Sequence, residues 1–140
     1  GWRVATAESC TGGLVAERIT RTPGASAVFE GGVVAYSDRA KTNLLGVSAQ
    51  ILEGKGSVSR EAAAAMADGA RIQFSVDLAL STTGFAGPDG SDVGHIFLAL
   101  ADRNSVEVHE MQYAGTREQI REAVADDALG LILARASGKP

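Results

Sequence analysis

Short strand-like runs alternate with helical stretches through most of this chain, and that order limits the folds it can adopt. Each run is short, apolar and bounded by turn residues, as buried strands are. The first three runs lie at residues 3–7, 31–36 and 78–83. Helical stretches separate these runs, so the pattern predicts strands joined by helical crossovers, as in a parallel sheet.

Two later runs, 95–101 and 106–113, are separated by the turn Asp102-Arg103-Asn104. This spacing is typical of an antiparallel hairpin. Together with the helix-linked strands, it predicts an α/β fold. We expect a single three-layer αβα domain over residues 1–140, with a mixed, partly parallel sheet and a C-terminal antiparallel hairpin.

Capping residues mark where the predicted helices begin. Ser37 and Ser59 precede helical stretches, and Thr116 with Gln119 three residues later fits a capping box. The helices are predicted at 14–20, 38–45, 48–52, 60–74 and 117–135.

The stretch 60–74 is rich in Ala and has one face of small side chains. That face consists of Ala62, Ala65, Met66, Gly69 and Ala70. We expect it to pack tightly on the sheet or on a partner helix. Since a second copy of the chain could supply that partner, a homo-oligomer remains an open expectation.

Composition argues against several classes of protein. The net charge is −4, and the 13 basic residues never adjoin one another, which is unlike a nucleic-acid-binding surface. A single Cys cannot form an internal disulfide, so we expect a reducing compartment, the cytoplasm. No apolar stretch approaches the roughly 20 residues of a membrane-spanning helix, so no membrane association is expected. The sequence opens directly on a strand-like run without a leader pattern, and we expect that a segment is missing upstream.

The turn after the first run, Glu8-Ser9-Cys10-Thr11-Gly12-Gly13, is the first candidate site. In open α/β sheets, ligands bind beyond the C-terminal ends of the strands. A helix that starts here would direct free backbone N–H groups at a phosphate or an oxyanion. Ser9 is the candidate nucleophile, although Ser9 or Thr11 acting only as a helix cap explains the same pattern. Cys10 ranks below Ser9, because no His is placed to serve a thiol nucleophile.

The next two strand ends carry compatible groups. Tyr36 ends the second run, and Lys41 lies in the first turns of the following helix. A Lys desolvated in a cleft can act as a general base, so Lys41 with Ser9 would form a Ser-Lys pair. A solvated surface charge is the alternative for a lone Lys. The Gly-rich segment 83–88 could cradle an anion with backbone amides or serve only as a tight turn.

The two His residues do not predict a metal site. His95 and His109 each fall in a predicted hairpin strand, and no Cys or second His lies nearby at ligand spacing. We therefore expect no metal and no cofactor, with both side chains packed or exposed on the hairpin.

Several motifs occur in an order that resembles one protein family. They are Ala7-Glu8-Ser9-Cys10-Thr11-Gly12-Gly13, the segment 34–41 with Leu45-Gly46-Val47, Gly56-Ser57-Val58-Ser59, the segment 83–90, and Gly115-Thr116-Arg117 with Ile120-Arg121. This set resembles the CinA C-terminal domain family, which includes the PncC-type nicotinamide-nucleotide amidohydrolases. The resemblance spans nearly the whole chain, from Val4 to about Leu133.

The resemblance implies an amidohydrolase that needs no metal or cofactor. Its expected reaction is hydrolysis of the carboxamide of nicotinamide mononucleotide, a small-molecule nucleotide, to nicotinic acid mononucleotide and ammonia, within the pyridine nucleotide cycle. Carried over by position, Ser9 matches the nucleophile, and Lys41 and Tyr36 match the groups that activate or orient it. The substrate-binding positions that it implies are Thr11, Gly12, Gly13, Thr83, Gly84, Gly87 and, for the substrate phosphate, Arg117.

The chain departs from the family's pattern at one loop. Family members have a longer loop after Gly-Pro that contains Lys-Pro-Val-Gly, whereas here Val93-Gly94 remains and the Lys-Pro is absent. The shorter loop weakens the expected grip on substrate, so a nucleotide-binding or regulatory domain with little turnover is the alternative. An amidohydrolase for a different small amide is a third hypothesis. The family also commonly has a helix before the first strand, which this sequence lacks.

Overall fold

The computed structural model describes residues 1–138, and its centre is a five-stranded sheet. The strands are β1 (Val4–Glu8), β2 (Phe29–Val34), β3 (Leu78–Gly84), β4 (His95–Ala101) and β5 (Val106–Gln112). Their order across the sheet is β2-β1-β3-β4-β5. β1 runs parallel to β2 and β3, whereas β4 runs antiparallel to β3 and β5. The predicted mixed sheet and its C-terminal hairpin are therefore confirmed.

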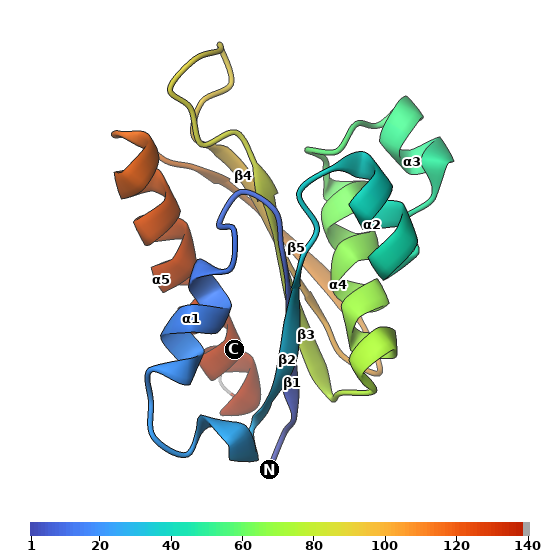
Figure 1. The fold of residues 1–140 in the computed structure, drawn as a ribbon, viewed down its shortest axis with the longest axis vertical. Helices are drawn as coiled ribbons and strands as arrows, with labels where there is room; N and C mark the ends of the chain where they lie inside the picture. Colours follow the sequence, from blue (N-terminus) through green and yellow to red (C-terminus); the bar gives the residue numbers. More distant parts are fainter. Residues whose placement is uncertain (139–140) are drawn as a thin grey trace.

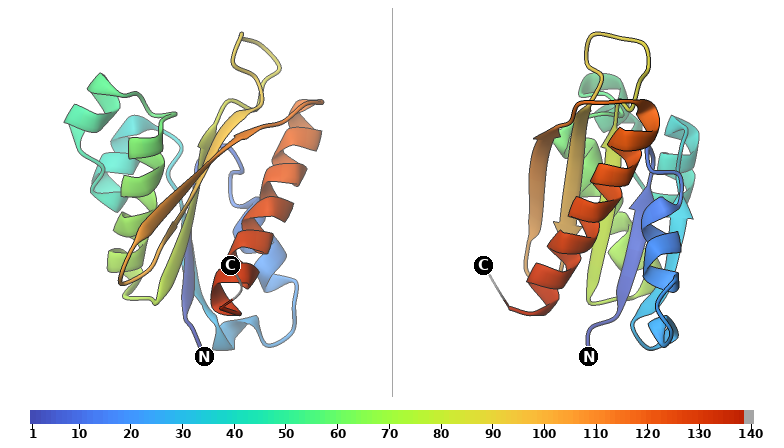
Figure 2. Two further views of the ribbon diagram at one scale, coloured as in Figure 1. Left: turned by 180° about the vertical axis from the view of Figure 1, so that it is seen from behind. Right: turned by 90° about the vertical axis from the view of Figure 1, so that its left-hand side faces the viewer.

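Helices cover both faces of this sheet (Figures 1 and 2). They are α1 (Leu14–Thr20), α2 (Asp38–Leu45), α3 (Ala49–Gly54), α4 (Arg60–Phe74) and α5 (Arg117–Ala136), with a 3₁₀ turn η1 (Ala25–Ala27). α1 and α5 lie on one face, and α2, α3 and α4 lie on the other, which confirms the three predicted layers. The segment between β3 and β4 extends beyond the end of the sheet at which β1 leads into α1, at the top in Figure 1.

The two faces of the sheet carry side chains of different size, because neighbours along a strand point to opposite faces. On β4, the large side chains of Ile96, Leu98 and Leu100 pack with residues of α1 and α5. Phe97, Ala99 and Ala101 pack instead with Ala63 and Ala67 of α4. Because Ala residues make up most of this contact, α4 can lie close against the sheet.

The packing face of α4 differs from the predicted one. Its buried residues are Ala62, Ala63, Met66, Ala67 and Ala70. Gly69 lies toward α2 instead, where an added Cβ would fall 2.0 Å from the carbonyl oxygen of Leu45. The sequence left the sheet and a partner helix open, and the small residues of α4 meet both the sheet and α2. The amphipathic period alone could not separate the two contact directions, since both are lined by small residues.

Hydroxyl caps begin four of the helices. Ser37, Ser48 and Ser59 each accept a hydrogen bond from a backbone N–H three residues later, at 3.0–3.2 Å. Thr116 and Gln119 form the predicted capping box at α5. Each cap satisfies an amide that has no partner within the first turn of a helix. α1 is the exception, because Gly13 occupies its cap position and supplies no side chain.

β2 begins and ends two residues earlier than the sequence predicts. Phe29 is paired with Val4, and the ladder ends where Val34 is paired with Glu8, the last residue of β1. The extent of a strand depends on its neighbour, which the pattern of one segment does not reveal. Tyr36 consequently lies in the connection to α2 and not in the strand.

Candidate active site

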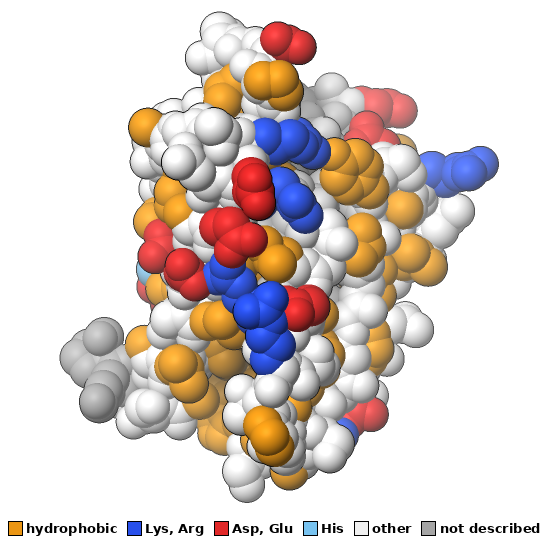
Figure 3. Space-filling model, turned by 60° about the vertical axis from the view of Figure 1, so that its left-hand side comes forward, with side chains coloured by type: hydrophobic (Ala, Val, Ile, Leu, Met, Phe, Trp, Pro, Cys, Tyr) orange, Lys and Arg blue, Asp and Glu red, His pale blue; other side chains and the backbone are white. Residues whose placement is uncertain are grey.

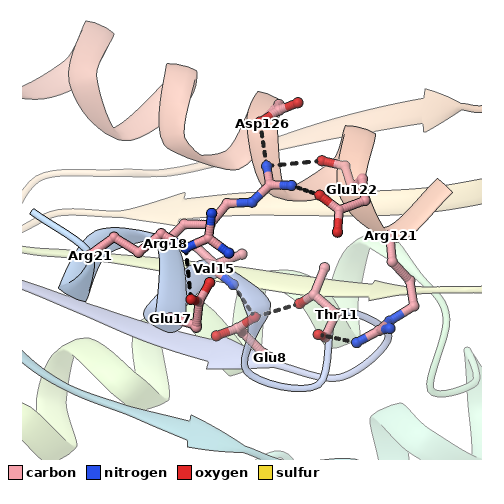
Figure 4. Close-up of polar contacts among 9 residues, drawn as sticks. All are labelled: Glu8, Thr11, Val15, Glu17, Arg18, Arg21, Arg121, Glu122 and Asp126. Carbon is pink, nitrogen blue, oxygen red and sulfur yellow. Dashed lines mark hydrogen bonds and ion pairs between the residues drawn. The ribbon is translucent and has the colours of Figure 1, made fainter. Parts of the chain in front are cut away.

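The turn between β1 and α1 is held by Glu8. This side chain is 1% exposed, and its carboxylate accepts hydrogen bonds from the Thr11 hydroxyl at 2.7 Å and from the amides of Val15 and Ala16 at 2.9 and 3.0 Å (Figure 4). A carboxylate at a helix N-terminus satisfies free amides and complements the helix dipole. The amides of Val15 and Ala16 therefore do not face a ligand, whereas a role for the amides of the turn itself stays a prediction. Neither Ser9 nor Thr11 caps the helix, so that alternative was wrong. The buried Glu8 carboxylate accepts hydrogen bonds from the first amides of the helix instead.

Ser9 and Lys41 come from different elements and lie in contact. Lys41 Nζ donates a hydrogen bond to Ser9 Oγ at 3.2 Å and to the carbonyl oxygen of Tyr36 at 3.4 Å. The exposed fraction is 9% for Ser9 and 2% for Lys41. Lys41 is thus a buried group beside a hydroxyl and not a solvated surface charge. The Ser9 amide donates to the carbonyl of Thr82 at 2.9 Å, which ties this residue to β3.

Burial changes the acid-base properties of two groups beside Ser9. Desolvation lowers the pKa of Lys41 below its ordinary 10.5, while the charge of Asp38 acts in the opposite direction. Burial raises the pKa of the Cys10 thiol to about 11. At neutral pH the thiol is therefore protonated, whereas the amine gives up its proton more easily than a solvated Lys. The hydroxyl of Ser9 is the better-placed nucleophile.

The backbone of the turn sets the direction of one further amide. The carbonyl of Ser9 accepts a hydrogen bond from the amide of Gly12 at 3.0 Å, so it points into the turn. In a trans peptide the next N–H points the opposite way, and the Cys10 amide therefore points out of the turn. Among residues 1–138, this amide donates to no other residue. The amides of Thr11 and Gly13 likewise donate to no described residue, so the turn has three amides left for an oxygen of a ligand.

Tyr36 and Arg117 meet at the edge of the same site. Arg117, in the first turn of α5, donates to the Tyr36 hydroxyl at 3.1 Å and to the carbonyl of Gly87 at 2.6 Å. Tyr36 is 61% exposed. One guanidinium thus links the segment after β2 to the loop after β3. Because these groups are open to solvent, Arg117 can exchange its partners for an anion.

A cleft of about 200 Å³ opens between these groups. It brings together six of the predicted site residues, namely Ser9, Tyr36, Lys41, Thr83, Gly84 and Arg117. Three larger hollows lie elsewhere in the described chain: an apolar groove of about 350 Å³ beside α1 and α5, one of about 520 Å³ between α2 and α4, and one of about 310 Å³ between β5 and α5. None of the three contains a buried nucleophile beside a buried base. We therefore place the candidate site in the smaller cleft.

Four predicted substrate-binding residues lie outside the lining of the cleft. They are Thr11, Gly12, Gly13 and Gly87. The Thr11 hydroxyl is fully buried between Glu8 and Thr82. Gly12 and Gly13 adopt φ values of +59° and +103°, which residues with a Cβ rarely adopt, so they build the turn. A direct contact between these residues and substrate stays a prediction.

The cleft also contains residues that the sequence did not single out. They are Ser57, Val58, Phe85 and Ala86. The Thr83 hydroxyl donates to the carbonyl of Ser57 at 2.7 Å, which draws the segment before α4 against the end of β3. Phe85 is 44% exposed and gives the cleft an aromatic wall. The motif Gly56-Ser57-Val58-Ser59 was the available signal for that segment, and Phe85 lies within the candidate loop 83–88 without having been given a role of its own.

The described residues 1–138 contain no group of three or more His, Cys, Asp or Glu side chains that could hold a metal ion. His95 lies 2.7 Å from Glu110 and packs at a tilt on Phe97, and His109 lies beside Glu107. His95 thus has a hydrogen-bond partner within the hairpin, whereas Nε2 of His109 is buried without one among the described residues. In the same part of the chain, no helix combines the length and the apolar character that crossing a membrane requires.

Two solved structures resemble this one closely. The competence/damage inducible protein CihA from Agrobacterium tumefaciens is 43% identical with a TM-score of 0.92, and the match covers 96% of this chain and 85% of that one. The competence damage-inducible protein A (ComA) from Klebsiella pneumoniae is 33% identical with a TM-score of 0.94, covering 98% and 88%. The fold is therefore shared by proteins of recognisably similar sequence.

Curated relatives extend well beyond the matched region. A CinA-like protein from Geotalea daltonii is 48% identical over 100% of this chain, and one from Geobacter sulfurreducens is 50% identical over 92%. The matches cover 35% and 32% of those relatives, so the chain spans about a third of their length. Residues 1–136 match the family model of the CinA C-terminal domain. The chain belongs to the CinA C-terminal domain family.

Proposed function

We propose that this chain hydrolyses the carboxamide of nicotinamide mononucleotide, with Ser9 as nucleophile and Lys41 as its base. The observation that carries the proposal is the 3.2 Å contact between a buried Lys amine and a Ser hydroxyl in a cleft. Pairs of this kind are a recurring form of the activated nucleophile. The resemblance to nicotinamide-nucleotide amidohydrolases supports this choice of substrate.

In the first step, neutral Lys41 takes the proton of Ser9 as Oγ bonds to the carboxamide carbon. The carbonyl oxygen becomes an oxyanion, and the outward-pointing Cys10 amide is the donor best directed toward it. The carbonyl then re-forms, the C–N bond breaks, and the proton on Lys41 leaves with ammonia. A water molecule attacks the acyl-enzyme, passes a proton through Lys41 back to Ser9, and releases the acid.

The size of the cleft supports partial burial of a nucleotide. A volume of about 200 Å³ falls below the roughly 300–1,000 Å³ of pockets that enclose a whole drug-sized ligand. The carboxamide and its ring would occupy the cleft beside Phe85, with the ribose phosphate outside. Arg117 lies at this edge and would exchange its contacts with Tyr36 and Gly87 for the phosphate, since guanidinium groups bind phosphate through paired donors.

Ammonia release tests the substrate directly. We expect turnover with nicotinamide mononucleotide and little with free nicotinamide, because the base alone lacks the phosphate that Arg117 would hold. Glutamine and other nucleotide amides complete the panel and address the hypothesis of a different small amide. Equal rates with nicotinamide and its mononucleotide would contradict the phosphate role. Turnover of another amide alone would contradict the substrate.

The dependence on pH follows from the lowered pKa of Lys41. Because the base must be neutral, kcat/KM should rise with pH through the pKa of Lys41, and this limb should lie below the 10.5 of an ordinary Lys. The charge of Asp38 raises that pKa, so Asp38→Asn should shift the limb to lower pH. Glu17→Gln, on α1 at the other face of the sheet, is the control and should leave the limb in place. A limb that does not move in Asp38→Asn would argue against Lys41 as the titrating group.

A nucleotide-binding domain with little turnover is the second candidate function. It is favoured by the loop after Pro88, whose residues 88–92 are all exposed and which is shorter than the loop the resemblance implies. Calorimetry separates the two candidates. Binding of nicotinamide mononucleotide without ammonia release over hours would select the second.

A further inference from the structure

Arg121 of α5 holds the turn that carries Ser9 from its outer side. Its guanidinium donates from Nε to the carbonyl of Cys10 at 3.1 Å and from Nη2 to the carbonyl of Thr11 at 2.9 Å; Figure 4 draws the Thr11 bond. Glu8 holds the same turn from within, through the Thr11 hydroxyl. The turn therefore lies between a fixed carboxylate and a fixed guanidinium. Cys10 and Thr11 lie more than 100 positions before Arg121 in the sequence.

The Arg121 contacts determine where the neighbouring amides point. Because the Thr11 carbonyl faces Arg121, the N–H of Gly12 in the same peptide points the opposite way, to the carbonyl of Ser9. The bond from Gly12 to the Ser9 carbonyl in turn fixes the peptide between Ser9 and Cys10, so that the Cys10 N–H is directed out of the turn. A guanidinium is planar, always charged and binds two acceptors in a rigid fork, so it fixes this arrangement over the whole working pH range.

We infer that Arg121 is a positioning residue for Ser9. It keeps Ser9 Oγ against Lys41 Nζ and keeps the Cys10 amide turned toward the oxyanion. The inference rests on the proposed function for its reaction, but the contacts that carry it belong to the fold. Arg121 does not line the cleft, in contrast to Arg117 one turn earlier on the same helix. It therefore acts through the turn and not on the substrate.

Arg18 provides a matched comparison within the same layer. The face of the molecule shown in Figure 3 carries charged side chains of both signs. Arg18 of α1 forms ion pairs with Glu122 and Asp126 of α5 (Figure 4). Like Arg121, it links the β1–α1 region to α5, and its side chain is only 13% exposed. Its hydrogen bonds go to α5 and none goes to residues 9–13.

The test compares Arg121→Gln, Arg121→Lys and Arg18→Gln in the full chain. The measurements are Tm, kcat and KM for ammonia release, and the rate at which a fluorophosphonate reagent labels Ser9, followed by intact mass. We expect Arg121→Gln to lower kcat and the labelling rate by about 100-fold, the scale of a 1 Å misplacement of a reacting group, with KM little changed. Arg121→Lys keeps one cationic donor and should fall between. Arg18→Gln should lower Tm while leaving kcat and labelling near wild type.

Each alternative outcome has a separate meaning. If wild type releases no ammonia but Ser9 is labelled, the proposed function fails while the labelling rates still test Arg121. A folded Arg121→Gln with wild-type kcat and labelling would overturn the inference, and so would a raised KM at unchanged kcat, which marks a ligand to the substrate. If Arg121→Gln does not fold, Arg121→Lys tests the inference through kcat and the rate of Ser9 labelling, and wild-type values of both would overturn it. Failure of the reagent to label wild-type Ser9 would overturn both proposals.

Discussion

Replacing Ser9 with Ala should lower kcat for ammonia release by about 10⁴-fold or more, because loss of a nucleophile removes the covalent route entirely. Binding of nicotinamide mononucleotide should persist, since the change removes one oxygen and leaves Arg117 and the other groups lining the cleft in place. A coupled ammonia assay measures the first quantity, and titration calorimetry measures the second.

Ser105→Ala is the matched control for this experiment. Ser105 lies in the exposed turn of the hairpin, where its hydroxyl makes one 3.4 Å contact with Asp102. This variant should keep wild-type kcat. Activity of Ser9→Ala equal to wild type would refute the assignment of the nucleophile, whatever the substrate proves to be.

Lys41→Met should lower kcat by about 10²- to 10⁴-fold, the usual contribution of a general base. The same variant should not lower the free energy of unfolding at neutral pH. Burial lowers the pKa of Lys41 in the folded state, so the unfolded state binds the proton more strongly. Stability attributable to Lys41 therefore increases as pH rises from its folded to its unfolded pKa, and below that window the buried charge is a cost. Met fills similar volume without that charge.

Two further Lys variants separate the base from a mere positive charge. Lys41→Arg keeps the charge but cannot accept a proton at working pH, so it should lose activity like Lys41→Met. Lys55→Met removes an exposed Lys after α3 and should change neither activity nor stability. Full activity of Lys41→Arg would show that Lys41 acts through its charge alone. A large drop in Tm for Lys41→Met would show that it supports the fold.

Local patterns explain which parts of the fold were predictable. Strand and helix positions follow from short-range periodicity, and the caps at Ser37, Ser59 and Thr116 depend only on residues three positions away. The limits of β2 were wrong by two residues because its extent depends on pairing with β1. The α4 face was wrong in part because small side chains serve equally well against a sheet and against α2.

The candidate site also has parts that follow from nearby residues and parts that depend on contact between distant segments. Ser9 and Lys41 were singled out by sequence because each lies next to a strand end or a helix start, and parallel strands bring such positions to one edge. Arg117 came from the family resemblance alone. The pairing of Ser9 with Thr82 and the wall formed by Phe85 were not predicted, since both depend on how β3 and its loop lie beside β1.

The sequence by itself determined the order of elements, the helix caps and the candidate nucleophile, because these depend on residues close together in the chain. Only the tertiary structure decided what surrounds Ser9. Glu8 binds the amides of Val15 and Ala16, Lys41 is buried against Ser9 and is not a surface charge, and Arg121 holds the turn from α5. The burial of Lys41 and the Arg121 contacts join segments that are far apart in the chain, and the Glu8 contacts depend on how the turn closes. None of these is encoded in the spacing of residues along the chain.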